Sequence, residues 1–180
     1  MRTLKKLLVL LFTLSISACS TMQPPRYAVS IHNVESLKEL ENAQFYVSEL
    51  DQSAEFKSTC RLIGFIEPAD GLTMSEFITK AFNDEARMAN VYSKDGVSIS
   101  GNVNKIVFSS VKGVTNGYWD IGITLYSTNG ESMTVDNIYN FKSGFDAITA
   151  CNATADALSP AVQDLISKTI NDPRFFQLLN

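Results

Sequence analysis

The sequence predicts an α+β fold in which a largely antiparallel sheet with a three-strand meander carries two main helices on one face. Three observations support this prediction. Apolar residues alternate over 119–126, turn dipeptides stand on both sides of this stretch, and helical apolar stripes occur before and after the meander. The order of strands, helix, meander and helix favours a sandwich with the helices on one face of the sheet.

The first part of the domain is expected to contain short strands and one short helix. Residues 27–31 alternate weakly and predict a strand, residues 34–41 predict two helical turns, and residues 45–50 predict a further strand. The polar stretch 51–57 predicts a loop. In the segment 60–66 (CRLIGFI), apolar residues occupy both the odd and the even positions, apart from Arg61 and Gly64. Such a pattern is typical of a strand that is covered on both faces.

A capping box marks the start of the first main helix. Thr73 can accept a hydrogen bond from a free backbone N–H, and Glu76 can reach back to the backbone of Thr73. The helix is expected to run from Met74 to about Tyr92, with one buried side. Its apolar stripe consists of Phe77, Ala81, Met88 and Tyr92, with Ile78, Phe82 and Ala89 beside them.

Three strands form the predicted meander. The first, 97–109, has Val97, Ile99, Val103 and Val107 in one phase, and interruptions at Gly101 and Lys105 predict a bulge or an edge position. Asn116-Gly117 and Asn129-Gly130 predict the hairpin turns, the second of type I′. The expected inward residues are Trp119, Ile121, Ile123 and Leu125 on the second strand, and Met133, Val135, Tyr139 and Phe141 on the third.

The second main helix is predicted over residues 146–171. Pro160 should either kink this helix or stand at the first position of a new helix capped by Ser159. Asp172-Pro173 should end it. Its apolar stripe passes through the proline without losing phase and consists of Ile148, Cys151, Ala155, Leu158, Val162, Leu165 and Ile166.

The first nineteen residues have the order of an export signal. A basic start over residues 2–6 precedes an apolar run over 7–16, and small residues close the segment at 17–19. Ten helical residues rise only about 15 Å, whereas a bilayer core needs roughly twenty residues. The segment is therefore a poor permanent transmembrane anchor.

The four residues Ile16-Ser17-Ala18-Cys19 resemble the lipobox of bacterial lipoproteins. The resemblance implies that Cys19 receives a diacylglyceryl group, that the signal peptide is cut before it, and that the new amino terminus is acylated, for example with palmitate. Several acyl chains make a durable membrane anchor. In this family Asp after the cysteine often retains the protein in the inner membrane, so Ser20 implies transport to the cell outer membrane, on its periplasmic face. The alternative is an ordinary secretory signal cleaved near Ala18, which leaves Cys19 unmodified.

The chain is expected to have three parts. Residues 1–18 are the lipoprotein signal peptide, residues 19–26 a lipidated tether, and residues 27–180 a single periplasmic α+β domain. Once Cys19 is lipidated, Cys60 and Cys151 remain as an even pair, which an oxidising compartment favours as a disulfide. Two buried free thiols are the alternative.

The charge balance argues against two classes of partner. Without residues 1–18 the chain has 12 Lys and Arg against 19 Asp and Glu, a formal net charge of about −7. Nucleic acid binding usually requires a basic surface, and electrostatic adhesion to anionic lipid does as well. Membrane attachment is therefore expected through the lipid on Cys19, without nucleic acid as a partner.

The sequence contains no pattern typical of an active site or a metal site, so we expect a non-enzymatic protein without a cofactor. Its one histidine, His32, stands near the first predicted strand, away from any metal-ligand spacing. Ser109 and Lys112 resemble a serine–lysine pair only superficially, because nothing would desolvate the lysine. Glu67 and Asp70 flank a turn, and turn chemistry explains Asp70 better than acid–base catalysis does.

Two stretches are candidates for binding. Residues 109–118 could form a recognition loop or a plain hairpin, and an exposed sheet edge could accept a partner strand. We therefore expect an accessory or interaction module of an envelope complex, with a protein partner in the envelope. The alternative is a carrier of a small ligand or lipid, which requires an apolar cavity between helices and sheet. The order of elements is also similar to that of transporter auxiliary lipoproteins and of the amino-terminal domain of the Tol translocation protein, a resemblance of architecture alone.

Overall fold

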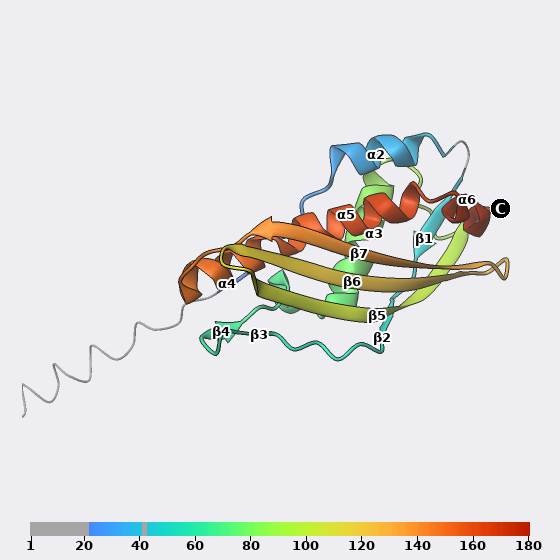
Figure 1. Ribbon diagram of the computed structural model, residues 1–180. Coiled ribbons are helices and arrows are strands. Elements are labelled where there is room, and N and C mark those ends of the chain that lie inside the picture. The colour runs from blue at the N-terminus through green and yellow to red at the C-terminus, as the bar shows by residue number, and fades with distance from the viewer. Residues whose placement is uncertain (1–21, 41–42) are drawn as a thin grey trace, which may run out of the picture.

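The computed structural model describes residues 22–40 and 43–180, and it confirms the predicted α+β class (Figure 1). The signal segment, the lipobox and Cys19 lie outside the described residues. Strands β5, β6 and β7 form an antiparallel meander, and the short strands β1 and β2 both pair with β5 in parallel. The strands are β1 (Phe45–Val47), β2 (Asp51–Gln52), β5 (Val97–Lys112), β6 (Asn116–Ser127) and β7 (Ser132–Lys142).

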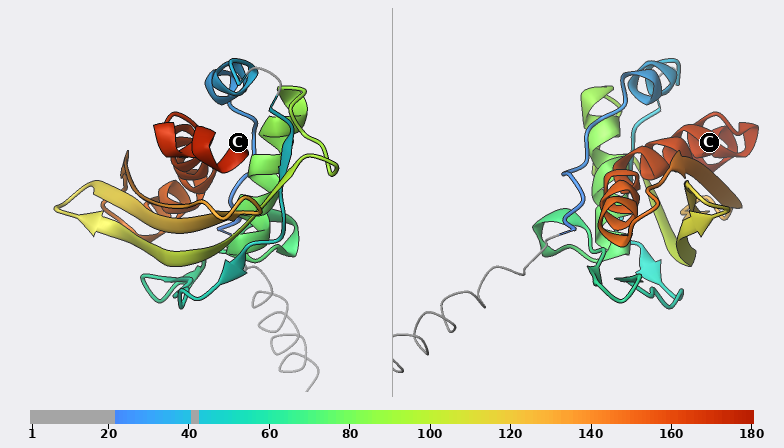
Figure 2. Two further views of the ribbon diagram at one scale, coloured as in Figure 1. Left: turned by 90° about the vertical axis from the view of Figure 1, so that its right-hand side faces the viewer. Right: turned by 60° about the vertical axis from the view of Figure 1, so that its left-hand side comes forward.

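The helices lie on one side of the meander (Figures 1 and 2). Trp119 on β6 is fully buried against them, and its indole N–H donates to the Thr154 carbonyl at 2.9 Å. The predicted inward residues Ile121, Ile123 and Leu125 are buried on the same face of β6. The helices are α2 (Ile31–Lys38), α3 (Met74–Met88), α4 (Ala147–Asp156), α5 (Leu158–Ile170) and α6 (Pro173–Leu179).

Helix α3 begins as predicted and ends earlier than predicted. The Thr73 and Glu76 capping box is present in both directions. The helix ends at Met88 because Asn90 takes a left-handed conformation (φ 62°), and the Val91 N–H bonds back to the Ala86 carbonyl at 3.0 Å. Met88 was expected in the buried stripe, but the early end leaves it 60% exposed.

The first meander strand contains the expected bulge. Its register with β6 shifts between Val103 and Lys105. The extra residue reverses which side chains face the core, so Val103 and Ile106 are both buried, while Val107 is exposed. The predicted inward position of Val107 is therefore wrong, because the apolar phase changes at the bulge.

The carboxy-terminal helical region is divided into three helices. The helix predicted over 146–171 is interrupted at Ala157. Pro160 is the third residue of α5. The first N–H groups of a helix form no intrahelical hydrogen bond, so a proline, which lacks this N–H, is tolerated there. Ser159 does not cap this helix. Helix α5 ends at Ile170, with Asn171 as its C-cap, just before the predicted Asp172-Pro173. Asp172 instead caps α6, accepting a hydrogen bond from the Arg174 N–H at 2.9 Å. The sequence did not predict α6.

The amino-terminal segment differs from the prediction. Residues 27–31 form no strand, because Ser30 caps α2 and the helix begins at Ile31. Within the predicted tether, Met22 is only 3% exposed, and the Arg26 guanidinium pairs with Asp70 at 2.9 Å. The described part of the tether, 22–26, therefore packs against the domain.

The segment 60–66 is not the covered strand that its apolar residues predict. It forms a hairpin with a three-residue loop, 61–63, between two short strands, β3 (Thr59–Cys60) and β4 (Gly64–Phe65). Arg61 and Leu62 take left-handed conformations, with φ of 45° and 59°, and reverse the chain between the two strands. The reversal turns Leu62 and Phe65 toward solvent, where they are exposed.

Candidate functional site

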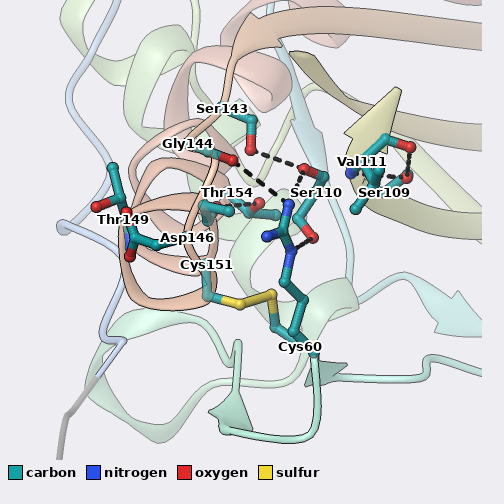
Figure 3. The surroundings of a disulfide bond; sticks show 12 residues. Cys60, Ser109, Ser110, Val111, Ser143, Gly144, Asp146, Thr149, Cys151 and Thr154 are labelled. Atoms are coloured by element: carbon teal, nitrogen blue, oxygen red, sulfur yellow. Dashed lines mark hydrogen bonds between the residues drawn. A yellow bond between two sulfur atoms is a disulfide. The ribbon is translucent and has the colours of Figure 1, made fainter. Parts of the chain in front are cut away.

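The β3–β4 hairpin is held to helix α4 by the pair Cys60 and Cys151 (Figure 3). The two sulfur atoms are 2.01 Å apart, and the Cα atoms are 5.9 Å apart, which is the geometry of a disulfide. Both residues are almost completely buried. The bond joins positions 91 residues apart in sequence, and it fixes the hairpin beside the start of α4.

Arg61 ties the same hairpin to two further segments. Its Nε donates to the Ser110 Oγ and its Nη2 to the Ser110 carbonyl, each at 3.0 Å. Its Nη1 donates to the Phe145 carbonyl, also at 3.0 Å. The Ser143 hydroxyl donates to the same Ser110 carbonyl at 2.7 Å (Figure 3). One guanidinium therefore holds together the hairpin, the end of β5 and the segment that leads into α4.

Seven apolar side chains are exposed on these three segments, on the adjoining β5–β6 turn and on the first turn of α4, and we call them together the end patch. It contains Leu62, which is 94% exposed, and Phe145, which is 81% exposed. Exposed apolar side chains that stand singly are normal, but a cluster of them is typical of an interaction surface. Figure 1 places the hairpin, the β5–β6 turn and α4 at one end of the molecule. The end patch consists of Leu62, Ile63, Phe65, Val111, Val114, Phe145 and Ile148.

The end patch explains one error in the predicted helix stripe. Ile148 was expected to be buried with Cys151, three residues later, but it is 57% exposed, while Cys151 is fully buried. Asp146 caps α4 by accepting from the Thr149 N–H at 2.9 Å, so Ile148 lies in the first turn of the helix. The first turn projects past the edge of the core, so helical spacing alone could not place this residue.

The described chain begins beside the same hairpin. The Met22 side chain packs on Gly64 of β4, so closely that a Cβ at Gly64 would lie 2.8 Å from the Met22 Cε. Met22 itself belongs to the hydrophobic core. Cys19 stands three residues earlier in sequence. A lipid on Cys19 would therefore be within about 11 Å of this edge even with the link fully extended.

The stretch 109–118, one of the two binding candidates from the sequence, forms the end of the β5–β6 hairpin. The turn is made by residues 113–115, with Gly113 at φ 75°. Val111 and Val114 contribute to the end patch. The backbone of this stretch is therefore a plain hairpin, one of the two forms considered from the sequence. Its exposed apolar side chains belong to the candidate site.

The other binding candidate was an exposed sheet edge, and the structure places one at β7. Two cationic side chains from the helices already donate to carbonyl oxygens of this strand. The Lys168 ammonium donates to the Asp136 carbonyl, and the Arg174 guanidinium donates to the Thr134 carbonyl at 3.4 Å. Such side chains obstruct the addition of a further strand, so we place the candidate site at the end patch instead.

The residues weighed for catalysis are not brought together. The Ser109 hydroxyl donates to the Val111 carbonyl at 2.8 Å, whereas the Lys112 ammonium donates to Asn140 Oδ1 at 2.9 Å. Asp70 is paired with Arg26, and His32 lies exposed on α2. Within residues 22–40 and 43–180, no three His, Cys, Asp or Glu side chains are grouped as metal ligands.

A buried carboxyl group at Glu85 escaped the sequence analysis. The Tyr27 hydroxyl donates to Glu85 Oε1, and the Ser30 N–H donates to the same oxygen at 3.2 Å. Burial raises the pKa of Glu85, against the opposing effect of these hydrogen bonds. Burial and the nearby carboxylate raise the pKa of Tyr27 as well. The position could have been recognised, because Glu85 continues the helical phase of Phe77 and Ala81.

The Glu85 cluster has a structural role in joining the amino-terminal segment to α3. Among the described residues, Glu85 Oε2 and the nearby Asn33 Oδ1 both lack a hydrogen-bond partner. A protonated Glu85 would supply one donor for this pair of acceptors. The group is fully buried, so the cluster offers no route for a substrate.

The layer between sheet and helices is filled by large side chains. Trp119, Phe77, Phe82 and Phe175 all belong to one hydrophobic core, and each is at most 2% exposed. A cleft of about 580 Å³ lies outside this layer, at the start of α3, and it is open to solvent. Its lining mixes polar and apolar residues, including Phe56, Glu67, Leu72 and Thr73.

The similarity of this chain to known proteins lies in its structure. No protein-family model matches the chain, and no curated protein matches it. A crystal structure from Caulobacter crescentus CB15, of a protein provisionally described as a lipoprotein, is similar with a TM-score of 0.45 and 12% sequence identity. The match covers 82% of this chain and 96% of that chain. None of the helices in the described part of the chain has the length and apolar character of a membrane span.

Proposed function

We propose that this protein is a lipoprotein of the cell outer membrane, attached through a lipidated Cys19 and facing the periplasm. Its domain acts as a non-enzymatic accessory module that binds a protein partner within an envelope complex. The observation that supports the anchor is the resemblance of residues 16–19 to a lipobox, and the buried Met22, three residues after Cys19, keeps the domain close to it. An anchor at Cys19 would hold this domain against the membrane rather than on a long linker.

The cysteine pair supports export to an oxidising compartment. Cys60 and Cys151 lie at bonding distance in the core, and such bonds form and persist outside the reducing cytosol. The periplasm is such a compartment. The lipobox, the pair and the short link to Met22 therefore agree on one location.

An accessory role is favoured over catalysis and over carriage. Of the side chains weighed as catalytic groups, Ser109, Lys112 and Asp70 are engaged with other partners. A carrier requires an apolar cavity between helices and sheet, and Trp119, Phe77 and Phe82 occupy that layer. The end patch is an exposed apolar surface, which neither catalysis nor carriage requires.

The proposal is tested by affinity capture of the full-length protein after crosslinking in its native membrane. A Cys19→Ala variant is the control, since it removes the lipid and leaves Cys60 and Cys151 intact. A stoichiometric envelope protein captured with the wild type and lost in the control supports the anchored accessory role. Normal assembly of every envelope complex in a deletion strain, with no protein captured in either form, contradicts it.

A further inference from the structure

We infer that the end patch is a bilayer-docking surface, which lies on the same lipid leaflet that holds the Cys19 anchor. This inference rests on the proposed lipidation. It adds that the domain contacts lipid directly with defined side chains, in one orientation, instead of moving freely at the end of its tether.

The first argument is the length of chain between the anchor and the patch. Met22 packs on Gly64, which lies between the patch residues Ile63 and Phe65. The link from Cys19 to Met22 spans at most about 11 Å. The surface beside Met22 is therefore the part of the domain that lies nearest to the bilayer. On either side of Gly64, the Ile63 and Phe65 side chains are apolar and exposed.

The second argument is the placement of the patch on chain reversals. Leu62 and Ile63 stand in the β3–β4 turn, Val114 stands in the β5–β6 turn, and Phe145 precedes the cap of α4. Side chains on turns and helix starts can enter the interfacial region, whereas a groove would suit an extended peptide or a helix.

The third argument is that the patch is held rigidly. The Cys60–Cys151 bond fixes three separate segments relative to one another, together with four hydrogen bonds that Arg61 donates to Ser110, Gly144 and Phe145. The exposed side chains are thus presented at fixed spacing, with little further ordering required on docking.

The charges beside the patch favour apolar insertion over electrostatic adhesion. Arg61 and Lys112 are the cations next to its residues in sequence, Lys142 lies at the same end through its hydrogen bond to Asn116, and Glu67 and Asp146 are the nearby anions. The local charges therefore nearly balance. The mature chain as a whole is acidic, with 12 Lys and Arg against 19 Asp and Glu. Added salt should therefore not release the patch from lipid.

The test uses the full-length lipidated protein, reconstituted in vesicles of phosphatidylethanolamine and phosphatidylglycerol. A small fraction of the phospholipid carries a photoreactive diazirine in its acyl chain, and labelled peptides are mapped by mass spectrometry. We expect labelling of the peptides that contain 61–66 and 143–149. The double variant Leu62→Asn and Phe145→Ser should lower that labelling by at least about tenfold, since burial of even one such side chain is worth about this factor in an equilibrium constant. Asn tolerates the left-handed backbone at position 62.

A matched control removes exposed apolar side chains at the opposite end of the meander. Tyr126 and Phe176 are 49% and 55% exposed. The neighbouring Ser127 hydroxyl bonds to the Leu178 carbonyl of α6 at 2.6 Å, so both control residues lie at that end. Strand β6, twelve residues long, separates this end from the β5–β6 turn by roughly 36–40 Å. The variant Tyr126→Ser and Phe176→Ser should leave the labelling unchanged.

The possible outcomes distinguish the proposed lipid anchor at Cys19 from the proposed docking surface. Wild-type protein that floats with the vesicles but is not labelled at the end patch overturns the docking surface and leaves the anchor intact. Protein that lacks lipid and fails to float overturns the anchor, and the docking surface with it. In native membranes, end-patch crosslinks to a protein instead of to phospholipid overturn the lipid assignment in favour of a protein interface.

Discussion

Glu85 shows how a single residue can fix the amino-terminal segment of the domain. Its carboxyl group accepts hydrogen bonds from Tyr27 and Ser30, both on the segment before α2. Burial disfavours the ionised form, which raises the pKa of Glu85. A group of this kind makes stability depend on pH, because the folded and unfolded states bind its proton differently.

The direction of this dependence follows from the raised pKa. Below the ordinary value of 4.5, Glu85 is protonated in both states. Above it, the unfolded state releases the proton first, so the contribution of Glu85 to stability falls as pH rises through the folded-state pKa. Glu85→Gln cannot ionise, and its amide can both accept from Tyr27 and donate to Asn33 Oδ1.

We therefore expect Glu85→Gln to raise the free energy of unfolding at pH 7 by on the order of 1 kcal/mol. The gain should shrink as pH falls to about 4.5. Urea unfolding across this pH range measures it. Glu76→Gln is the matched control, because hydrogen bonds from Thr73 lower the pKa of Glu76, so its contribution is lost as pH falls. A Glu85→Gln protein less stable than the wild type at pH 7 would refute this account of the cluster.

At the scale of elements, sequence pattern predicted the parts whose side chains follow one period. The capping box at Thr73 and the alternation from Trp119 to Leu125 are local signals, and both were correct. The bulge near Lys105 was predicted, but not its effect on Val107. A bulge shifts the phase by one residue, and only the register with β6 shows where this happens.

The end patch was not predictable in the same way. The run CRLIGFI predicts a covered strand, because apolar residues are usually buried. Two non-glycine residues with positive φ, Arg61 and Leu62, reverse the chain there, and such conformations have no strong sequence signature. They are held by tertiary contacts of Arg61 with Ser110 and Phe145, which lie 49 and 84 residues away. Local sequence therefore lacked the information that turned these apolar side chains outward.

The link between the hairpin and α4 leads to a prediction about the cysteines. Cys60 and Cys151 should resist alkylation in freshly isolated protein and should react only after reduction and unfolding. Cys60→Ala with Cys151→Ala should lower the free energy of unfolding by about 2–5 kcal/mol, as for other disulfides that close long loops. Mass spectrometry after alkylation and denaturant unfolding provide the two readouts. Two thiols that label freely without reductant would rule out the bond.

At the scale of the whole molecule, the features gather at one end. The described part of the chain begins at Met22 beside β4, and the Cys60–Cys151 pair and Arg61 join three segments at the same end (Figure 1). The side chains of the end patch are exposed on these and the adjoining segments. The opposite end carries α6 and the β6–β7 turn. An anchor at Cys19 would therefore orient the domain, with the end patch toward lipid and the rest toward the periplasm.

The measurement that tests this account most directly is the mass of the amino-terminal peptide of protein extracted from membranes. We expect a chain that begins at Cys19 and carries the diacylglyceryl group and an amide-linked acyl chain, with residues 1–18 removed. The Cys19→Ala variant should lack this peptide and should no longer separate with the membrane fraction. A mature protein that begins after Ala18 with an unmodified Cys19 thiol would contradict the anchor, and the membrane-facing role of the end patch would be lost with it.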